Sequence, residues 1–129
     1  MYVTIDFNSD EAFYIQLKKQ IIMGIAMAQI REGDSLPSVR DMADDIGINM
    51  HTVNKAYAIL KQEGYLKLDR RRGAVVCLDP DRLRAVNETR MHMRETIAGA
   101  LCRDLSPKEL HAILDEVLAE FGYGRSEND

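Results

Sequence analysis

The chain has 129 residues, of which 46% are hydrophobic and 29% are charged. This composition excludes a disordered or collagen-like chain and is sufficient for one hydrophobic core or two small ones. The longest apolar run, residues 21–28, is far shorter than the roughly 18 to 20 apolar residues of a membrane span. The N-terminus also has no positive segment followed by an apolar stretch, so we expect a cytoplasmic protein with no membrane partner.

The net charge of −4 is unevenly distributed along the chain. Residues 1–78 carry ten Lys or Arg and ten Asp or Glu, whereas residues 79–129 carry seven basic and eleven acidic side chains. This balance argues against nonspecific coating of nucleic acid, but it is compatible with a site-specific binder that has one basic face. Cys77 and Cys102 are too few for a disulfide framework, and we expect both to be packed thiols.

The first half of the chain has the pattern of three helices. Apolar residues recur at three- and four-residue spacing over residues 10–29, which predicts an amphipathic helix. A short second helix is expected to begin after the cap Ser38 and to end at Gly47. Asn49 is a good cap for a third helix, which Gly64 ends. The second and third helices therefore meet at a tight turn.

Two short strands follow the third helix. Residues 65–68 and 74–78 are strand-like, and residues 69–73 between them carry three consecutive arginines. Three helices followed by a hairpin with a basic tip form a winged helix-turn-helix domain, which we assign to residues 1–78. The expected fold class is mainly α with a small β-hairpin.

Residues 79–129 are predicted to form two further helices, the second of them capped by Ser106 with Pro107 at its first position. Their apolar stripes are too wide for a two-helix hairpin to bury alone, so we expect this region to pack on the first domain, on another copy of the chain, or on both. The candidate dimer contacts are Leu83, Val86, Met93, Ile97, Leu101, Leu110, Leu114 and Leu118.

The predicted third helix would present its N-terminal turns to the major groove of double-stranded DNA. Polar side chains on its outer face, at His51, Thr52, Asn54 and Lys55, have the chemistry to read base edges. The arginine tip of the hairpin suits the sugar-phosphate backbone or the minor groove. Binding to a DNA operator is therefore the leading functional hypothesis.

Three runs in this region carry a family resemblance: GDSLPSVRDMA at residues 33–43, INMHTVNKAY at 48–57 and LKQEGY at 60–65. They closely resemble the N-terminal domain of GntR-family transcriptional regulators, and the match spans about residues 10–78. The short helical C-terminal part resembles the YtrA subfamily, which implies that residues 79–129 are a helical dimerisation unit. This resemblance implies a homodimeric repressor, often of operons that encode ABC-type transporters.

The resemblance also implies roles for single residues. Ser38 and Arg40 match positions that touch the DNA backbone or bases, Thr52 matches a phosphate-contacting position, and Gly73 matches the wing-tip glycine. Many members have Arg where this chain has Met50 and Asn54, so we expect a shifted operator sequence rather than a loss of binding. The full candidate DNA-contacting set is Ser38, Arg40, Asn49, His51, Thr52, Asn54, Lys55, Arg70, Arg71, Arg72 and Gly73.

Simpler interpretations remain open for several of these features. The three arginines at residues 70–72 are also what a solvated turn contains, and Arg40 could pair with an aspartate of its own helix, Asp41, Asp44 or Asp45. An alternative function is a protein-interaction module built on a winged helix without DNA binding. Its weakness is that protein interfaces centre on apolar anchors, whereas the predicted surface is polar and basic.

Catalytic and metal sites are not expected. The sequence contains no phosphate-cradling glycine loop and no nucleophile motif, so we predict that the protein is not an enzyme and uses no cofactor. Met91 and Met93 flank His92 but point about 200° apart on a helix, so the three cannot converge on one metal ion. Met23 and Met27 could line a pocket for an unknown small-molecule effector, although packing in the core is the better expectation.

Overall fold

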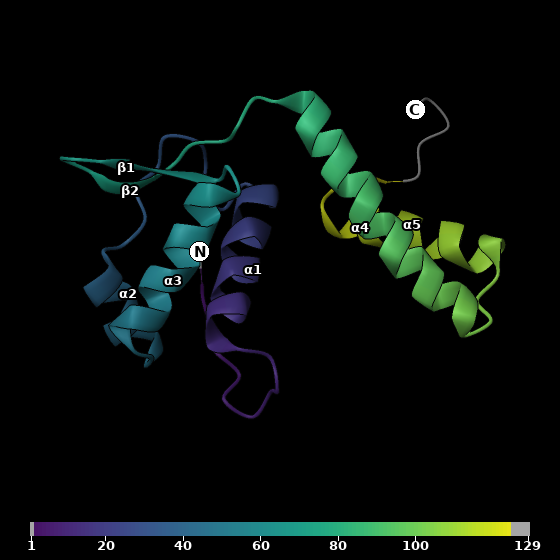
Figure 1. Ribbon diagram of the computed structural model, residues 1–129, viewed down its shortest axis with the longest axis horizontal. Coiled ribbons are helices and arrows are strands. Elements are labelled where there is room, and N and C mark those ends of the chain that lie inside the picture. The colour runs from purple at the N-terminus through teal and green to yellow at the C-terminus, as the bar shows by residue number, and fades with distance from the viewer. Residues whose placement is uncertain (1, 125–129) are drawn as a thin grey trace. The chain divides into compact units, whose positions relative to one another are not determined.

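A computed structural model describes residues 2–124, so the last five residues of the predicted C-terminal region lie outside it. The chain divides into two compact units, Met1–Asp79 and Pro80–Asp129 (Figure 1). The described elements are α1 (Phe13–Ala26), α2 (Val39–Ile46), α3 (Met50–Gln62), β1 (Leu66–Asp69), β2 (Gly73–Val76), α4 (Arg82–Cys102) and α5 (Pro107–Glu120). The first five form a winged helix-turn-helix and confirm the predicted fold class.

Local capping determines where α2 and α3 begin and end. The Ser38 hydroxyl accepts a hydrogen bond from the Asp41 amide at 3.1 Å, and the side chain of Asn49 accepts one from the His51 amide at 2.7 Å. Gly47 ends α2 with φ +74°, a left-handed conformation that favours glycine. These boundaries agree with the sequence prediction. Helix α1 is shorter than the predicted residues 10–29 at both ends.

The hydrophobic core of the first unit is organised around α3. Its inner side chains Val53, Ala56 and Leu60 have no exposed surface, and α3 packs against α1, α2 and β1. Leu17 and Ile21 supply the buried face of α1, which lies beside α3 in Figure 1. This packing buries one face of α3 and leaves the opposite face exposed to solvent. By contrast, the expected core packing of Met23 on α1 and of Met27, which follows α1, is wrong, because both are exposed.

The hairpin is a two-stranded antiparallel sheet in which Leu66 is opposite Val76 and Asp69 is opposite Gly73. Its second strand is also paired on the other side. The Leu36 amide donates to the Ala74 carbonyl at 2.8 Å, and Ser35 forms an isolated bridge with Val75. The segment between α1 and α2 thus joins the hairpin to the helices, which positions the hairpin tip.

The chain before α1 is held by two glutamine amides. The Asp6 amide donates to Gln16 Oε1 at 2.9 Å, while Gln16 Nε2 donates to the carbonyls of Asp6 at 3.1 Å and Glu11 at 2.9 Å. Gln20, one turn later, makes the same kind of paired contact with the backbone of Thr4. Gln16 is buried, so its amide satisfies backbone groups that water cannot reach freely.

The second unit consists of α4 and α5. A capping box begins α5, in which the Ser106 hydroxyl accepts from the Glu109 amide and the Glu109 carboxylate accepts from the Ser106 amide, with Pro107 at the first position. This start was predicted. Neither helix contains a buried residue, and the two make few close backbone approaches to each other. Their apolar faces are therefore largely uncovered in the single chain.

The structure also tests the predictions about a membrane span and about the two cysteines. No helix among residues 2–124 is long and apolar enough to cross a membrane. Cys77 and Cys102 are both free thiols; Cys77 is half-buried, but Cys102 is exposed, so the expectation of a packed thiol is wrong for Cys102.

Replacing the buried amide tests how the N-terminal segment is held. Gln16→Met keeps the length of the side chain but leaves the backbone groups of Asp6 and Glu11 unpaired, so we expect the free energy of unfolding to fall by about 2 kcal/mol. Urea denaturation at fixed protein concentration measures it. The matched change Gln20→Met, at a more exposed position, should cost about half as much or less. Equal losses for the two variants would contradict this account.

Candidate nucleic-acid interface

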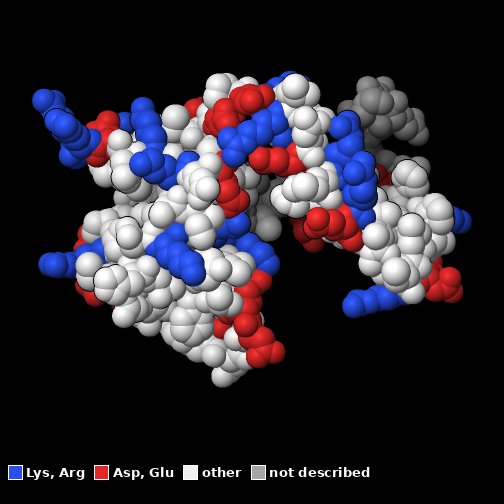
Figure 2. Space-filling model, in the orientation of Figure 1, with Lys and Arg blue, Asp and Glu red and all other residues white. Residues whose placement is uncertain are grey.

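The start of α2, the outer face of α3 and the hairpin share one continuous surface. A first groove is lined by residues from the starts of α2 and α3, and a second groove runs from the start of α2 across α3 to the hairpin. Val39 and Asn54 line both grooves, so the two are adjacent. Figure 2 shows Lys and Arg side chains gathered at the end of the hairpin, which bounds this surface.

The start of α2 is fixed by a contact that the sequence analysis did not identify. The Tyr57 hydroxyl, on α3, donates to the carbonyl of Pro37 at 2.9 Å. Burial raises the pKa of Tyr57 above its usual range, so the phenol stays neutral and keeps its donor proton. The contact places the N-cap Ser38 and, two residues later, the exposed side chain of Arg40. A tyrosine at an otherwise apolar core position of α3 was the available signal.

Arg40 is accessible at the second position of α2. Over the described residues it makes no ion pair with Asp41, Asp44 or Asp45, so the alternative of a pairing within its own helix is not realised. Its guanidinium therefore remains available for an outside partner such as a phosphate.

The predicted side chains of α3 divide into three groups. Asn49 uses its side-chain oxygen as the cap of α3. His51 and Asn54 are exposed, and Thr52 is half-buried. Lys55 is exposed too, but its Nζ lies 4.0 Å from the centre of the Tyr14 ring on α1. This cation–π contact directs the ammonium toward α1, at the side of the helix.

The hairpin tip is built around Asp69. Its Oδ1 accepts hydrogen bonds from the amides of Arg71 at 2.8 Å and Arg72 at 3.1 Å, which hold the pKa of the carboxyl below its usual range. Gly73 follows with φ +74°, a conformation that closes the turn and that favours glycine. The turn is thus ordered by its own side chain, as in an Asx turn.

The three arginines of the tip are not equivalent. The guanidinium of Arg72 donates to the carbonyl of Gly33, in the segment between α1 and α2. Arg70 and Arg71 are exposed and, among the described residues, their side chains have no hydrogen-bond partner. Arg72 therefore ties the tip to the body of the domain, while Arg70 and Arg71 are the charges free to meet an external anion.

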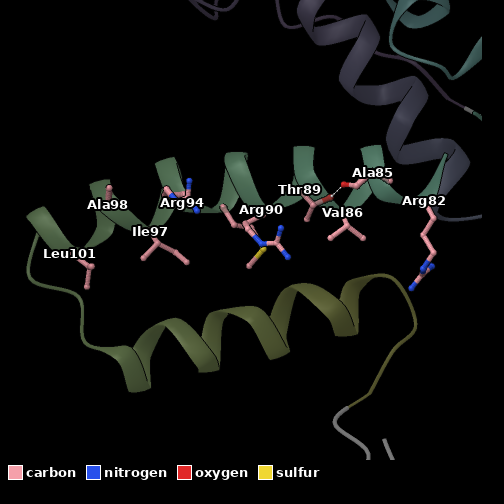
Figure 3. Close-up of a pocket in the computed structure, with 10 residues that line it drawn as sticks. Arg82, Ala85, Val86, Thr89, Arg90, Arg94, Ile97, Ala98 and Leu101 are labelled. Carbon is pink, nitrogen blue, oxygen red and sulfur yellow. Dashed lines mark hydrogen bonds between the residues drawn. The ribbon is translucent and has the colours of Figure 1, made fainter.

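The second unit carries an apolar groove of about 760 Å³ along α4. Four of the predicted dimer contacts line it, namely Val86, Met93, Ile97 and Leu101, whereas Leu83 is exposed outside it. In Figure 3 the side chains of Val86, Ile97 and Leu101 point from α4 toward α5. The predicted residues of α5, Leu110, Leu114 and Leu118, are half-buried or exposed.

Metal ligands do not gather in the described part of the chain, where no three His, Cys, Asp or Glu residues lie close enough to hold an ion.

The combination of a capped helix-turn-helix, an exposed outer face on α3 and a basic hairpin tip defines the class of winged helix-turn-helix DNA-binding regulators. Residues 13–76 match the model of the bacterial regulatory proteins of the gntR family. The chain is 35% identical to YtrA from Sulfolobus acidocaldarius, a GntR-family transcription factor. The alignment covers 92% of this chain and 98% of that one, and the two structures superpose with a TM-score of 0.55. The chain belongs to the GntR family, and it is similar to the YtrA members of that family.

Two other relatives extend over nearly the whole chain. It is 28% identical over 126 residues to the HTH-type transcriptional repressor YtrA of Bacillus subtilis, covering 95% of this chain and 97% of that protein. A transcriptional antiterminator from Listeria monocytogenes is 26% identical with a TM-score of 0.83, covering 98% of this chain and 96% of that one. The relatives are regulators of transcription, and the protein is accordingly a DNA-binding regulator and not an enzyme.

Removing the hydroxyl that fixes the start of α2 should have two effects. Tyr57→Phe leaves the Pro37 carbonyl without its donor, so we expect the free energy of unfolding to fall by about 1 kcal/mol and DNA affinity to fall with it. Urea denaturation and DNA titration measure these effects. Tyr65→Phe is the matched control, because the Tyr65 hydroxyl has no hydrogen-bond partner within residues 2–124. Similar losses in both variants would argue against a positioning role for Tyr57.

Proposed function

We propose that the protein is a homodimeric repressor that binds a pseudo-palindromic operator in the cytoplasm and controls a transporter-type operon. The observation that carries the DNA-binding part is the shared surface formed by α2, α3 and the hairpin. The repressor assignment is supported by the similarity to the Bacillus subtilis repressor YtrA. The transporter assignment rests on the family resemblance of the short C-terminal part.

In the proposed complex, the first turns of α3 enter the major groove. His51 and Asn54 face the base edges, while Ser38, Arg40 and Thr52 lie where they contact the backbone on one side. Arg70 and Arg71 reach the backbone or minor groove on the other side. In this arrangement Lys55, whose Nζ lies 4.0 Å from the centre of the Tyr14 ring, approaches a phosphate at the flank of the helix. Asn49, Arg72 and Gly73 shape the surface through their hydrogen bonds and backbone conformation.

Dimerisation is supported by the uncovered apolar faces of α4 and α5. Neither helix has a buried side chain, and most helical stability in proteins comes from packing of an apolar face, so a second copy that covers these faces would supply the missing core. A symmetric dimer presents two winged helix-turn-helix units, one from each copy, which we call heads. The spacing of the operator half-sites then follows from the distance between the two heads. No small-molecule effector is needed for this arrangement.

The defining experiment is the selection of bound sequences from a random duplex pool at about 150 mM salt, where nonspecific binding is suppressed. We expect enrichment of a two-fold symmetric motif, whose half-site spacing reports the dimer geometry. Recovery of no motif from a folded, dimeric protein would contradict the proposed function.

Arg40 should contribute to binding without contributing to sequence preference. Arg40→Ala removes one free charge per head, so we expect affinity to fall for all DNA sequences and the salt dependence to lose about two ion equivalents per dimer. Titration of the selected operator at several salt concentrations measures both quantities. Arg103→Ala, at the end of α4, removes the same charge from the other unit and should leave both nearly unchanged. Full affinity of Arg40→Ala at moderate salt would show that the proposed docking is wrong.

Two methionines of α4 provide a matched test of dimerisation. Met91 is 49% exposed and Met93 42% exposed in the single chain, but only Met93 lines the apolar groove. Met93→Asp places a charge in the proposed interface, so we expect a monomer by light scattering and loss of tight operator binding. Met91→Asp makes the same chemical change on the opposite side of α4 and should remain dimeric. A dimeric Met93→Asp variant would exclude this face from the interface.

A further inference from the structure

The outer face of α3 lacks the side chains that usually recognise guanine. Guanine is read most often by a bidentate Arg or Lys on its O6 and N7 atoms. Helix α3, residues Met50–Gln62, contains no arginine. The lysine in its first two turns, Lys55, holds its Nζ 4.0 Å from the centre of the Tyr14 ring. The start of α3 therefore carries no arginine, and its one lysine is held at the side of the helix.

What this face offers instead is an amide beside an apolar groove. The amide of Asn54 is exposed and has no hydrogen-bond partner among the described residues. Met50, one helical turn earlier, is 44% exposed although it is apolar. It lines the groove between the starts of α2 and α3 together with Val39 and Asn54. A primary amide and an apolar groove thus lie next to each other on the surface proposed to meet DNA.

We infer that α3 reads neighbouring A·T base pairs in each half-site. The Asn54 amide donates to N7 of an adenine and accepts from its N6 amino group, which is the bidentate pattern that an amide makes with adenine. The C5-methyl group of a thymine enters the groove between Met50 and Val39. This inference rests on the proposed function, because it requires α3 to lie in the major groove.

The spacing of the two side chains agrees with this assignment. Residues four apart on a helix have Cβ atoms about 5 to 6 Å apart, and successive bases of a strand rise about 3.4 Å. Asn54 and Met50 can therefore reach neighbouring base pairs at the same time. The adenine N6 and N7 atoms and the thymine methyl group all lie on the major-groove edge, so both contacts are made from one side of the DNA.

The first test compares selected motifs. Selection from a random duplex pool is carried out with the unmodified protein and with Asn54→Ala, Met50→Ala and the control Gln29→Ala, an exposed polar residue after α1 that lines neither groove. The positions at which Asn54→Ala and Met50→Ala lose preference identify the contacted bases. We expect A·T pairs at these positions in the wild-type motif and no change of motif for Gln29→Ala.

The second test changes single atoms of the selected operator. Replacing the assigned thymine by deoxyuridine removes only the methyl group and should weaken wild-type binding about fourfold per contact. Replacing the assigned adenine by 7-deazaadenine removes N7 and should weaken it by about fivefold or more. The first replacement should weaken binding of Met50→Ala less than binding of the wild-type protein, because only Val39 still contacts the methyl group. The second replacement should not affect Asn54→Ala.

The outcomes separate this inference from the proposed function. A symmetric wild-type motif with G·C pairs at the positions assigned to Asn54 and Met50, or a motif that neither variant alters, would overturn the A·T assignment and leave the operator-binding function standing. The assignment would also be overturned if deoxyuridine weakened DNA binding by Met50→Ala, or 7-deazaadenine weakened DNA binding by Asn54→Ala, as much as each weakens binding by the wild-type protein. Failure of the wild-type protein to enrich any motif would remove the proposed function and the inference together.

Discussion

The fold of the first unit depends on the burial of one face of α3. Val53, Ala56 and Leu60 are completely enclosed, and three different elements pack around this helix. Because a helix has only one orientation in which that stripe is buried, the same packing determines which side chains are left outside. Asn54 is exposed for this reason, and so is the groove beside Met50. The proposed reading face is thus a direct consequence of the core.

Features set by neighbouring residues could be predicted from the sequence. Ser38, Asn49 and Ser106 cap their helices through bonds to amides two or three residues later, so the local sequence already contains both partners. The end of α1 was misplaced because no glycine marks it; Ala28 instead adopts φ +58° shortly after the helix. The fold class therefore followed from caps and periodicity, whereas the two ends of α1 did not.

Contacts between distant segments could not be predicted in the same way. The bond from Tyr57 to Pro37 spans 20 residues, and the bond from Arg72 to Gly33 spans 39. Periodicity assigned Tyr57 to the buried face, but it does not specify which carbonyl its hydroxyl meets. These long-range bonds change the functional interpretation, because Arg72 and Lys55 are partly committed inside the domain while Arg40, Arg70 and Arg71 are free.

The charge layout explains why a dimer would matter for such a protein. Residues 79–129 are acidic overall, and in the described part of the first unit the exposed cations whose side chains make no ion pair, hydrogen bond or cation–π contact are Arg31, Arg40, Lys61, Lys67, Arg70 and Arg71. With so few charges, one head gains limited affinity from phosphates, and that affinity falls steeply with salt. Joining two heads makes the second binding event intramolecular, so the gain is realised only on DNA whose half-sites match the spacing of the heads. In the proposed dimer, weak binding by each DNA-binding domain would therefore favour selectivity, because a single half-site elsewhere in the genome would retain the protein poorly.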